Sequence, residues 1–284
     1  MALRKQLIQL YKHVCWLDVH ALKPGNVSVY ADAQELKVDD FLSSAKASVE
    51  PITETNISLG ERILSSAQAT YGAVGTNTNL GIILLISPLI QAIYALGDDT
   101  HIEELALRNS LERVLNLTTI EDAVHVYQAI RLMNPGGMGK KDDQDVSQEP
   151  EVSLLKTMQI ASSWDQIAAQ YSNNYEDVFN IGAPKFQTLM QHWQDEKWAT
   201  TGLFMSYLSQ FPDSLIERKH GQLKAKVISD MIRDLERDLS RSDLPGSYEG
   251  QLIKIDTQLK RDLINPGTTA DLTAASIFAS GLVN

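Results

Sequence analysis

The stretch Leu80–Leu96 reads LGIILLISPLIQAIYAL and is the longest apolar run in the sequence. A helix that is apolar on all sides is either buried in a large core or spans a membrane. A membrane span needs about 20 apolar residues, whereas this run is shorter and contains Pro88 and Gln91. We therefore expect a buried core helix rather than a membrane span.

Helical periodicity continues on both sides of this run, and clean alternating strands are missing. The two predicted core stripes are Leu3, Leu7, Leu10, Val14 and Leu17 near the N-terminus, and Leu223, Val227, Met231, Leu235 and Leu239 near the C-terminus. We predict an all-α protein with roughly ten or more helices. They are expected to form a single globular domain over residues 1–284.

Local signals mark where helices begin and where the chain breaks. Capping boxes are predicted at Ser58–Glu61 and Thr118–Glu121, and a looser one at Thr268–Asp271. The turns KPGN (23–26), NPGGMG (134–139) and NPG (265–267) interrupt the helical pattern. Residues 140–151 are polar and charged, so we expect a loop there that could act as a lid.

Composition narrows the class of function. The 284 residues carry a net charge of −11, which argues against non-specific nucleic-acid binding. A lone cysteine, Cys15, permits neither an internal disulfide nor a cysteine-based zinc site. Arg4 and Lys5 are not followed by a long apolar region, so we expect no secretory signal, no membrane association and a cytoplasmic protein. The common nucleotide-binding, zinc-protease and serine-hydrolase motifs are missing.

Glycine- and asparagine-rich helix starts are the candidate binding elements. GTNTNLG (75–81) and NPGTTAD (265–271) each precede a predicted helix, whose first N–H groups favour an anion. Glycine lets a phosphate approach the backbone closely. Ordinary helix capping explains the same residues.

Two cationic segments could likewise either bind phosphate or have an ordinary structural role. Lys23 stands beside a rigid turn, where it could contact phosphate or simply be solvated. RKHG (218–221) could clamp phosphates, or it could be a helix C-terminus that ends at Gly221.

Six segments occur in the order KPGNV, SLGERI, GTNTNLG, NPGGMG, RKHG and NPGTTADLTAA. This series resembles the triphosphoribosyl-dephospho-CoA synthase family from about Leu17 to Leu282. The resemblance implies an all-α fold, ATP as a substrate and Mg²⁺ as its companion. It implies transfer of a 5″-triphosphoribosyl group to the 2′-hydroxyl of 3′-dephospho-CoA, with release of adenine.

One position departs from the family pattern. The family typically has His-Lys after the Asn-Thr pair, whereas this chain has Asn79-Leu80. The variant resembles a subgroup associated with one-carbon metabolism and methanopterin-like carriers, for which the acceptor need not be dephospho-CoA.

The chemistry implied by the resemblance suggests roles for residues in these segments. Loss of adenine leaves oxocarbenium-like charge on the ribose, which a carboxylate would stabilise. A second group must accept the proton of the attacking hydroxyl. We predict Glu61 and Asp271 as catalytic residues and as ligands of Mg²⁺. The predicted substrate- and phosphate-binding residues are Lys23, Gly25, Asn26, Asn77, Asn79, Gly81, Arg218, Lys219, His220, Gly267, Thr268 and Thr269.

Three functions are weighed from the sequence. The first is the triphosphoribosyl transferase. The second is a related nucleotide-dependent phosphoribosyl transferase, or a nucleotide-cleaving enzyme, that acts on a one-carbon cofactor precursor. The third is a non-catalytic helical binding protein. The expected partners are small nucleotides, with a homodimer as a candidate assembly. The two enzymatic functions depend on whether the glycine-bearing turns meet in space to hold a polyphosphate nucleotide.

Overall fold

The computed structural model describes residues 2–32, 36–97, 102–140 and 143–283, and within these ranges it contains fourteen α-helices and no β-sheet strand. The first six helices are α1 (Ala2–His20), α2 (Val38–Ile52), α3 (Leu59–Val74), α4 (Leu80–Leu96), α5 (Glu104–Asn116) and α6 (Ile120–Met133). The next four are α7 (Leu154–Ala161), α8 (Gln166–Ser172), α9 (Ala183–Trp193) and α10 (Glu196–Gln210). The last four are α11 (Ser214–His220), α12 (Gln222–Arg241), α13 (Glu249–Arg261) and α14 (Gly267–Leu282). A π-helical turn at Val178–Gly182 and a 3₁₀ turn at Pro245–Tyr248 complete the order. The all-α prediction is confirmed.

The helix α4 has the bounds of the apolar run and is buried on nearly every side. It packs against α3, α5 and α14. No helix among the described residues is long and apolar enough to cross a membrane. The prediction of a buried core helix is therefore confirmed.

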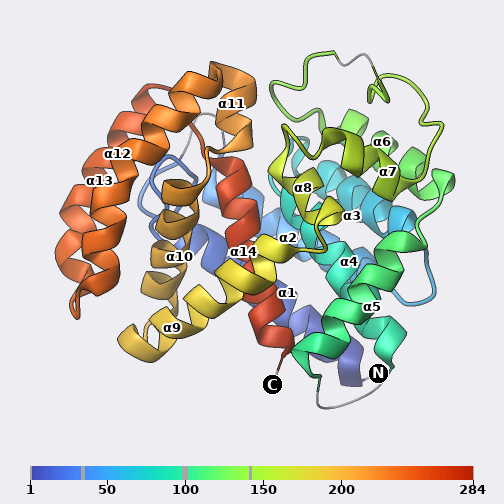
Figure 1. The fold of residues 1–284 in the computed structure, drawn as a ribbon, viewed down its shortest axis with the longest axis horizontal. Coiled ribbons are helices and arrows are strands. Elements are labelled where there is room, and N and C mark those ends of the chain that lie inside the picture. The colour runs from blue at the N-terminus through green and yellow to red at the C-terminus, as the bar shows by residue number, and fades with distance from the viewer. Residues whose placement is uncertain (1, 33–35, 98–101, 141–142, 284) are drawn as a thin grey trace.

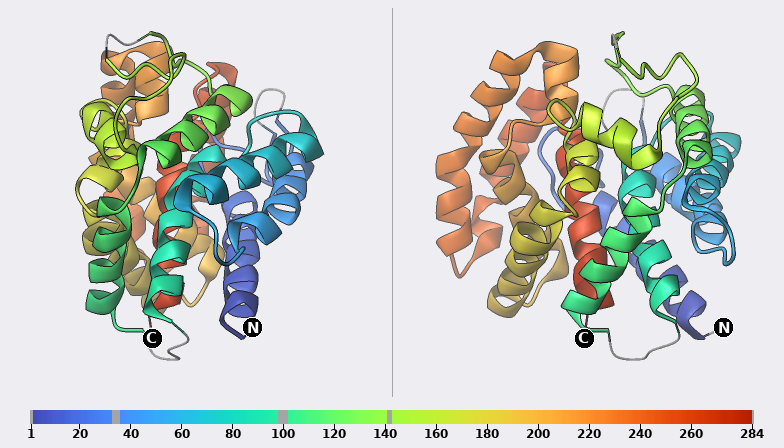
Figure 2. Two further views of the ribbon diagram at one scale, coloured as in Figure 1. Left: turned by 90° about the vertical axis from the view of Figure 1, so that its right-hand side faces the viewer. Right: turned by 45° about the vertical axis from the view of Figure 1, so that its right-hand side comes forward.

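Two apolar clusters hold the helices together. The larger cluster is built mainly from α1 to α9, and the smaller one from α10 to α13. Both α10 and α14 contribute to each cluster, because their opposite faces are apolar. In Figure 1, α14 runs through the middle, with α12 and α13 on one side and α3 to α7 on the other. The two termini lie at the same end of the molecule in both views of Figure 2.

The predicted N-terminal stripe is confirmed in its central part, since Leu7, Val14 and Leu17 are buried. The C-terminal stripe is wrong over its first half. Leu223 is 77% exposed and Val227 is 51% exposed, while α12 buries Ile228 and Ile232 instead.

Helix geometry explains this difference. A step of four residues turns about 40° beyond a full circle, so five such residues drift across roughly 160° of the helix surface. The stripe on α12 starts on the solvent side and reaches the core only at Leu239.

Of the three predicted capping boxes, one forms as predicted, one forms one residue later, and the one at Thr268–Asp271 is wrong. Ser58 and Glu61 form the predicted box at the start of α3. At α6 the box forms one residue later, between Thr119 and Asp122, because Asp122 also accepts a hydrogen bond from the Gly60 N–H and is fixed by that contact. At α14 the helix begins at Gly267, ahead of the predicted cap, and no box forms.

Candidate functional site

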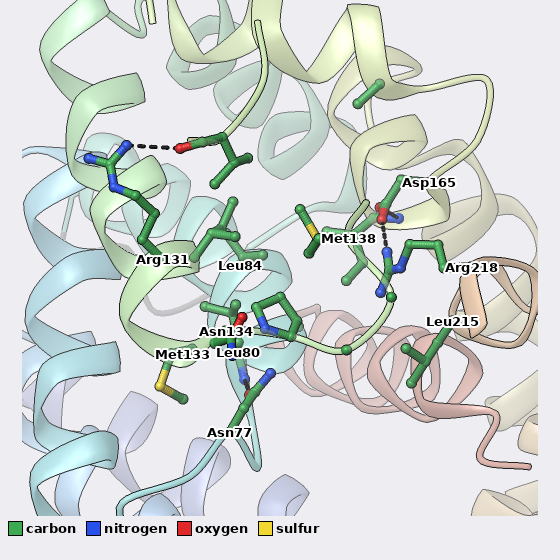
Figure 3. A pocket seen from close by; sticks show the side chains of 18 of the residues that line it. Asn77, Leu80, Leu84, Arg131, Met133, Asn134, Met138, Asp165, Leu215 and Arg218 are labelled. Atoms are coloured by element: carbon green, nitrogen blue, oxygen red, sulfur yellow. Dashed lines mark hydrogen bonds and ion pairs between the residues drawn. The ribbon is translucent and has the colours of Figure 1, made fainter. Parts of the chain in front are cut away.

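A cavity of about 1340 Å³ lies where the beginnings of α4 and α14, the end of α11 and the loop after α6 meet. Segments that are far apart in the sequence therefore share one wall, part of which is shown in Figure 3. Six of the predicted site residues line this cavity, namely Asn77, Gly81, Arg218, Lys219, Thr268 and Asp271. The expected convergence of the glycine-bearing turns occurs for these residues.

The buried carboxylate of Asp213 joins α11 to α14. Its Oδ1 accepts hydrogen bonds from the N–H groups of Leu215 and Ile216, which caps α11. Its Oδ2 accepts from the Thr269 N–H at 2.7 Å and from the Thr269 hydroxyl at 2.8 Å. Burial raises the pKa of Asp213, and the hydrogen bonds from Thr269 and α11 oppose that rise. One carboxylate thus fixes the cations of α11 relative to the first turn of α14.

Glycines in the loop after α6 allow close contact with the end of α11. A Cβ atom on Gly136 would lie 2.4 Å from Lys219 Cε. Gly137 has a φ of +78°, and a Cβ there would lie 3.2 Å from the Arg218 backbone. A side chain at Gly136 would displace the end of Lys219, and one at Gly137 would be strained by the positive φ. The sequence pattern predicts a turn in this segment but indicates no binding residue in it.

Asp165 forms an ion pair with Arg218 at the cavity wall, as Figure 3 shows. Asp165 also caps α8 through the N–H groups of Ile167 and Ala168. Lys219 has no ion-pair partner among the described residues. The cavity therefore offers one oriented guanidinium group and one lysine whose charge is not neutralised by a paired carboxylate.

Asp271 lies one turn into α14, directly against the first turn of α4. A Cβ atom on Gly81 would lie 2.0 Å from Asp271 Oδ2, so only glycine leaves room for the carboxyl group. Burial raises the pKa of Asp271 well above its usual value, and the charges of Asp18 and Asp213 raise it further. Lys23 and Arg218 oppose this rise. The cavity thus contains a carboxyl group with a strong affinity for a proton.

Three predicted binding residues form a buried turn behind the wall. Lys23 is 0% exposed, and its Nζ is paired with Asp18 and donates to Asn26 Oδ1 at 2.9 Å. Gly25 has a φ of +85°, and a Cβ there would lie 2.8 Å from Pro266 Cδ. The turn is thereby packed onto the segment that precedes α14. None of Lys23, Gly25 and Asn26 lines the cavity.

Five other predicted residues also lie outside the cavity wall. Glu61 is exposed and accepts from the Ser58 N–H, and His220 lies at the surface against the Leu263 carbonyl. Asn79 is buried and hydrogen-bonded to Thr70 and Ser48. Gly267 and Thr269 stand at the beginning of α14, where Thr269 is bound by Asp213. Roles for these five residues in binding or catalysis stay predictions, since none of them lines the cavity.

The rest of the wall is largely apolar and was not anticipated from the sequence. Its main members are Leu80, Leu84, Val126, Ile130, Met133, Met158, Ile160 and Ile167. They come from α4, α6, α7 and α8, so helical periodicity alone cannot separate them from core residues. The cavity therefore has a charged part near α11 and α14 and an apolar part near α6 to α8.

The loop between α6 and α7 covers part of this apolar wall. The Tyr127 hydroxyl donates to the Gln144 carbonyl at 2.6 Å, and burial raises the pKa of Tyr127 to about 12. Arg131 donates to the carbonyls of Val146 and Gln148. These contacts attach the described part of the predicted lid to α6, while residues 141 and 142 lie outside the described residues.

The model of the ATP:dephospho-CoA triphosphoribosyl transferase family matches residues 4–284. The chain belongs to this family. Its members use ATP as the donor of the triphosphoribosyl group and dephospho-CoA as the acceptor. The resemblance inferred from the six sequence segments is confirmed.

A solved structure gives the same result. It is a protein of Archaeoglobus fulgidus to which triphosphoribosyl-dephospho-CoA synthase activity has been ascribed, and it is 25% identical in sequence. The alignment covers 86% of this chain and 97% of the archaeal chain, with a TM-score of 0.64. Among curated proteins, no match was found.

Proposed function

We propose that this protein transfers the triphosphoribosyl group of ATP to the 2′-hydroxyl of 3′-dephospho-CoA and releases adenine. The observation that carries the proposal is that Arg218, Lys219 and Asp271 line one cavity in a chain of this transferase family. Cations suit the triphosphate, and a carboxyl group suits the reacting carbon. The cavity volume of about 1340 Å³ exceeds that of an ordinary single-ligand pocket, which is about 300–1,000 Å³.

The triphosphate is proposed to lie at the charged part of the cavity. Lys219 would contact it as a point charge, and Arg218 would donate N–H groups from a guanidinium oriented by Asp165. Thr268 lines the same wall in the first turn of α14, where the helix dipole favours an anion. Two helices, α11 and α14, would thus share the charge of one ligand.

Asp271 is proposed to act at the ribose. The bond between the ribose C1′ and adenine N9 breaks, and its electron pair leaves with adenine, which takes up a proton. The acceptor oxygen then bonds to C1′, and its hydroxyl proton passes to the Asp271 carboxylate, which releases it to solvent, while solvent supplies the proton that adenine takes up. A raised pKa makes the ionised carboxylate a strong base. Its negative charge would also stabilise the positive charge that develops on the ribose.

The described residues fit a magnesium ion that is carried mainly by the triphosphate. They contain no group of three or more histidine, cysteine, aspartate or glutamate residues placed to hold a metal. Mg²⁺ in nucleotide sites usually has only one or two protein carboxylates, with phosphate and water as the other ligands. Since Asp271 is assigned to the ribose, Asp143 or Asp145 in the loop after α6 would supply that carboxylate. When bound, the ion would neutralise phosphate charge.

The apolar part of the cavity is proposed to take the uncharged arm of the acceptor. Leu80 lies on this wall, at a position where the family typically has a lysine. The acceptor end therefore lacks one cation that the usual family pattern would provide. We propose a cytoplasmic location, because the substrates are intracellular nucleotides. A homodimer is likewise a proposal.

The proposed function is tested by chromatographic detection of free adenine after mixing the protein with Mg-ATP and dephospho-CoA. We expect adenine and a triphosphoribosylated product in equal amounts, and neither without dephospho-CoA. Adenine formed at the same rate without dephospho-CoA would contradict the proposed acceptor. Absence of Mg-ATP binding would contradict the proposal as a whole.

Replacing Lys219 with methionine should weaken Mg-ATP binding about tenfold or more, because a contact with an ionised group is lost. Methionine keeps much of the side-chain volume against Gly136 while removing the charge. Isothermal titration calorimetry measures the dissociation constant.

The matched control is Lys254→Met, which removes the same charge from an exposed position on α13 outside the cavity. It should bind Mg-ATP as the native protein does. Equal weakening in both variants would mean that only the overall charge of the protein matters, and that Lys219 does not contact the nucleotide.

A further inference from the structure

A chain of three hydrogen-bonded side chains leads from the buried turn behind the cavity to its wall. Lys23 Nζ donates to Asn26 Oδ1 at 2.9 Å, and Asn26 Nδ2 donates to Asn265 Oδ1 at 2.9 Å. Lys23 is fully buried and Asn26 is 5% exposed, whereas Asn265 lines the cavity. The chain therefore begins at a buried charge and ends at the proposed nucleotide site.

The direction of this chain is fixed by chemistry. An ammonium group can only donate hydrogen bonds, so the Asn26 side chain must turn its carbonyl oxygen toward Lys23. The Asn26 NH₂ group must then face Asn265, which can receive it only with its own carbonyl oxygen. Lys23 is itself held in place by its ion pair with Asp18.

The orientation of Asn265 follows from these two steps. Its carbonyl oxygen is occupied by Asn26, which leaves its NH₂ group as the polar end that remains. Among the described residues no acceptor is found for that NH₂ group. A residue that could present either a donor or an acceptor is thus restricted to presenting a donor.

We propose that Asn265 donates a hydrogen bond from Nδ2 to an anionic oxygen of the ATP triphosphate, and that Lys23 and Asn26 are positioning residues that hold it in the donating orientation. This inference rests on the proposed function of the cavity. Lys219 and Thr268 line the same cavity, so an anion held there meets further donors. The buried lysine then acts on the ligand through two amides.

Two single variants test the polarity of Asn265. Asn265→Ala removes the donor and should weaken Mg-ATP binding about tenfold, the factor expected for losing a hydrogen bond to a charged group. Asn265→Asp keeps an acceptor for Asn26 but turns a negative oxygen toward the cavity, so binding should weaken further than in Asn265→Ala. If Asn265 instead presented its carbonyl to the ligand, Asn265→Asp would bind Mg-ATP as well as the native protein, which would overturn the proposal.

A third variant tests the relay without altering Asn265. Asn26→Asp keeps an oxygen for Lys23 and places a second oxygen against Asn265. Asn265 must then turn its NH₂ group inward and present its carbonyl oxygen to the cavity. Mg-ATP binding should weaken about tenfold. In the Asn265→Ala background the same Asn26→Asp change should have less than about a twofold effect, because the responding amide is gone.

The double variant separates positioning from a merely structural role. An equal effect of Asn26→Asp in both backgrounds would mean that it acts through the fold or through general charge, and would overturn the relay. Inorganic tripolyphosphate and adenosine serve as two further probes. We expect the Asn265 variants to lose affinity for tripolyphosphate and keep affinity for adenosine, and the reverse pattern would overturn the assignment to phosphate.

The native protein distinguishes failure of this inference from failure of the proposed function. If the native protein binds neither Mg-ATP nor tripolyphosphate, both the function and the inference fail. If the native protein binds Mg-ATP and releases adenine while all Asn265 and Asn26 variants bind like it, only the inference fails. Thermal unfolding of each variant, which should stay cooperative, confirms that the binding data report on folded protein.

Discussion

Replacement of Asp271 by asparagine is expected to lower the turnover number about 100-fold or more, because the proposed proton acceptor is removed at the reacting centre. The change is nearly isosteric, so the space beside Gly81 stays filled. The dissociation constant for Mg-ATP should change much less than the turnover number, since the triphosphate is held elsewhere. Adenine release under saturating substrates, together with calorimetric binding, measures the two quantities separately.

The same replacement should stabilise the folded protein near neutral pH. The pKa of Asp271 is raised on folding, mainly by burial and then by the charges of Asp18 and Asp213. The folded state therefore holds the proton more tightly than the unfolded state, and the contribution of Asp271 to the free energy of unfolding falls as the pH rises from the unfolded pKa through the folded pKa. Asparagine does not titrate and avoids this loss.

Thermal unfolding in EDTA across a range of pH tests the sign of this effect. The melting temperature of the asparagine variant should exceed that of the native protein at about pH 8. The difference should narrow as the pH falls toward the ordinary value of 3.8 for an aspartate. A variant that is inactive and also less stable at high pH would indicate a structural role for Asp271, and retained turnover would remove it from the mechanism.

The sequence predicts the centre of the fold well, because its strongest pattern, the apolar run 80–96, belongs to a buried helix. The apolar run 80–96 becomes α4 with the same bounds, and the protein core takes up its apolar side chains. The turns also form where glycine and proline predict them, as at Gly25 and Gly137. The prediction that the motifs converge on one site depended on the family resemblance, because helical periodicity does not indicate which turns lie close together in space.

The roles that the sequence could not separate are those that depend on long-range partners. Lys23 beside a turn has the pattern of a solvated lysine or a phosphate ligand, and only its buried contact with Asp18 shows a third possibility. Asp213 looks like an ordinary helix cap until Thr269, far along the chain, is found on its other oxygen. Glu61 behaves locally as its capping box predicts. Local rules succeed where the partner is local.

Replacing Gly81 with alanine is expected to disable the enzyme by displacing Asp271. The added methyl group would lie 2.0 Å from Asp271 Oδ2 and 2.3 Å from its Cγ, so the carboxyl group must move. A helical glycine-to-alanine change ordinarily stabilises by about 1 kcal/mol, whereas overpacking of this kind costs about 1–3 kcal/mol. We expect a net loss of stability and a fall in turnover of about tenfold or more, measured by denaturant unfolding and adenine release.

A matched control and a double variant identify the cause of that effect. Gly72 lies in α3, and a methyl group there would meet nothing within 4 Å, so Gly72→Ala should gain up to about 1 kcal/mol and keep full turnover. In an Asp271→Ala background the obstructing carboxyl group is gone, and Gly81→Ala should become neutral or stabilising. If Gly81→Ala cost the same free energy in both backgrounds, the methyl group would be acting against something other than Asp271. Strong coupling between the two positions would instead show that Gly81 of α4 leaves the space that the Asp271 carboxyl group of α14 occupies. This contact places the reactive group at the cavity wall.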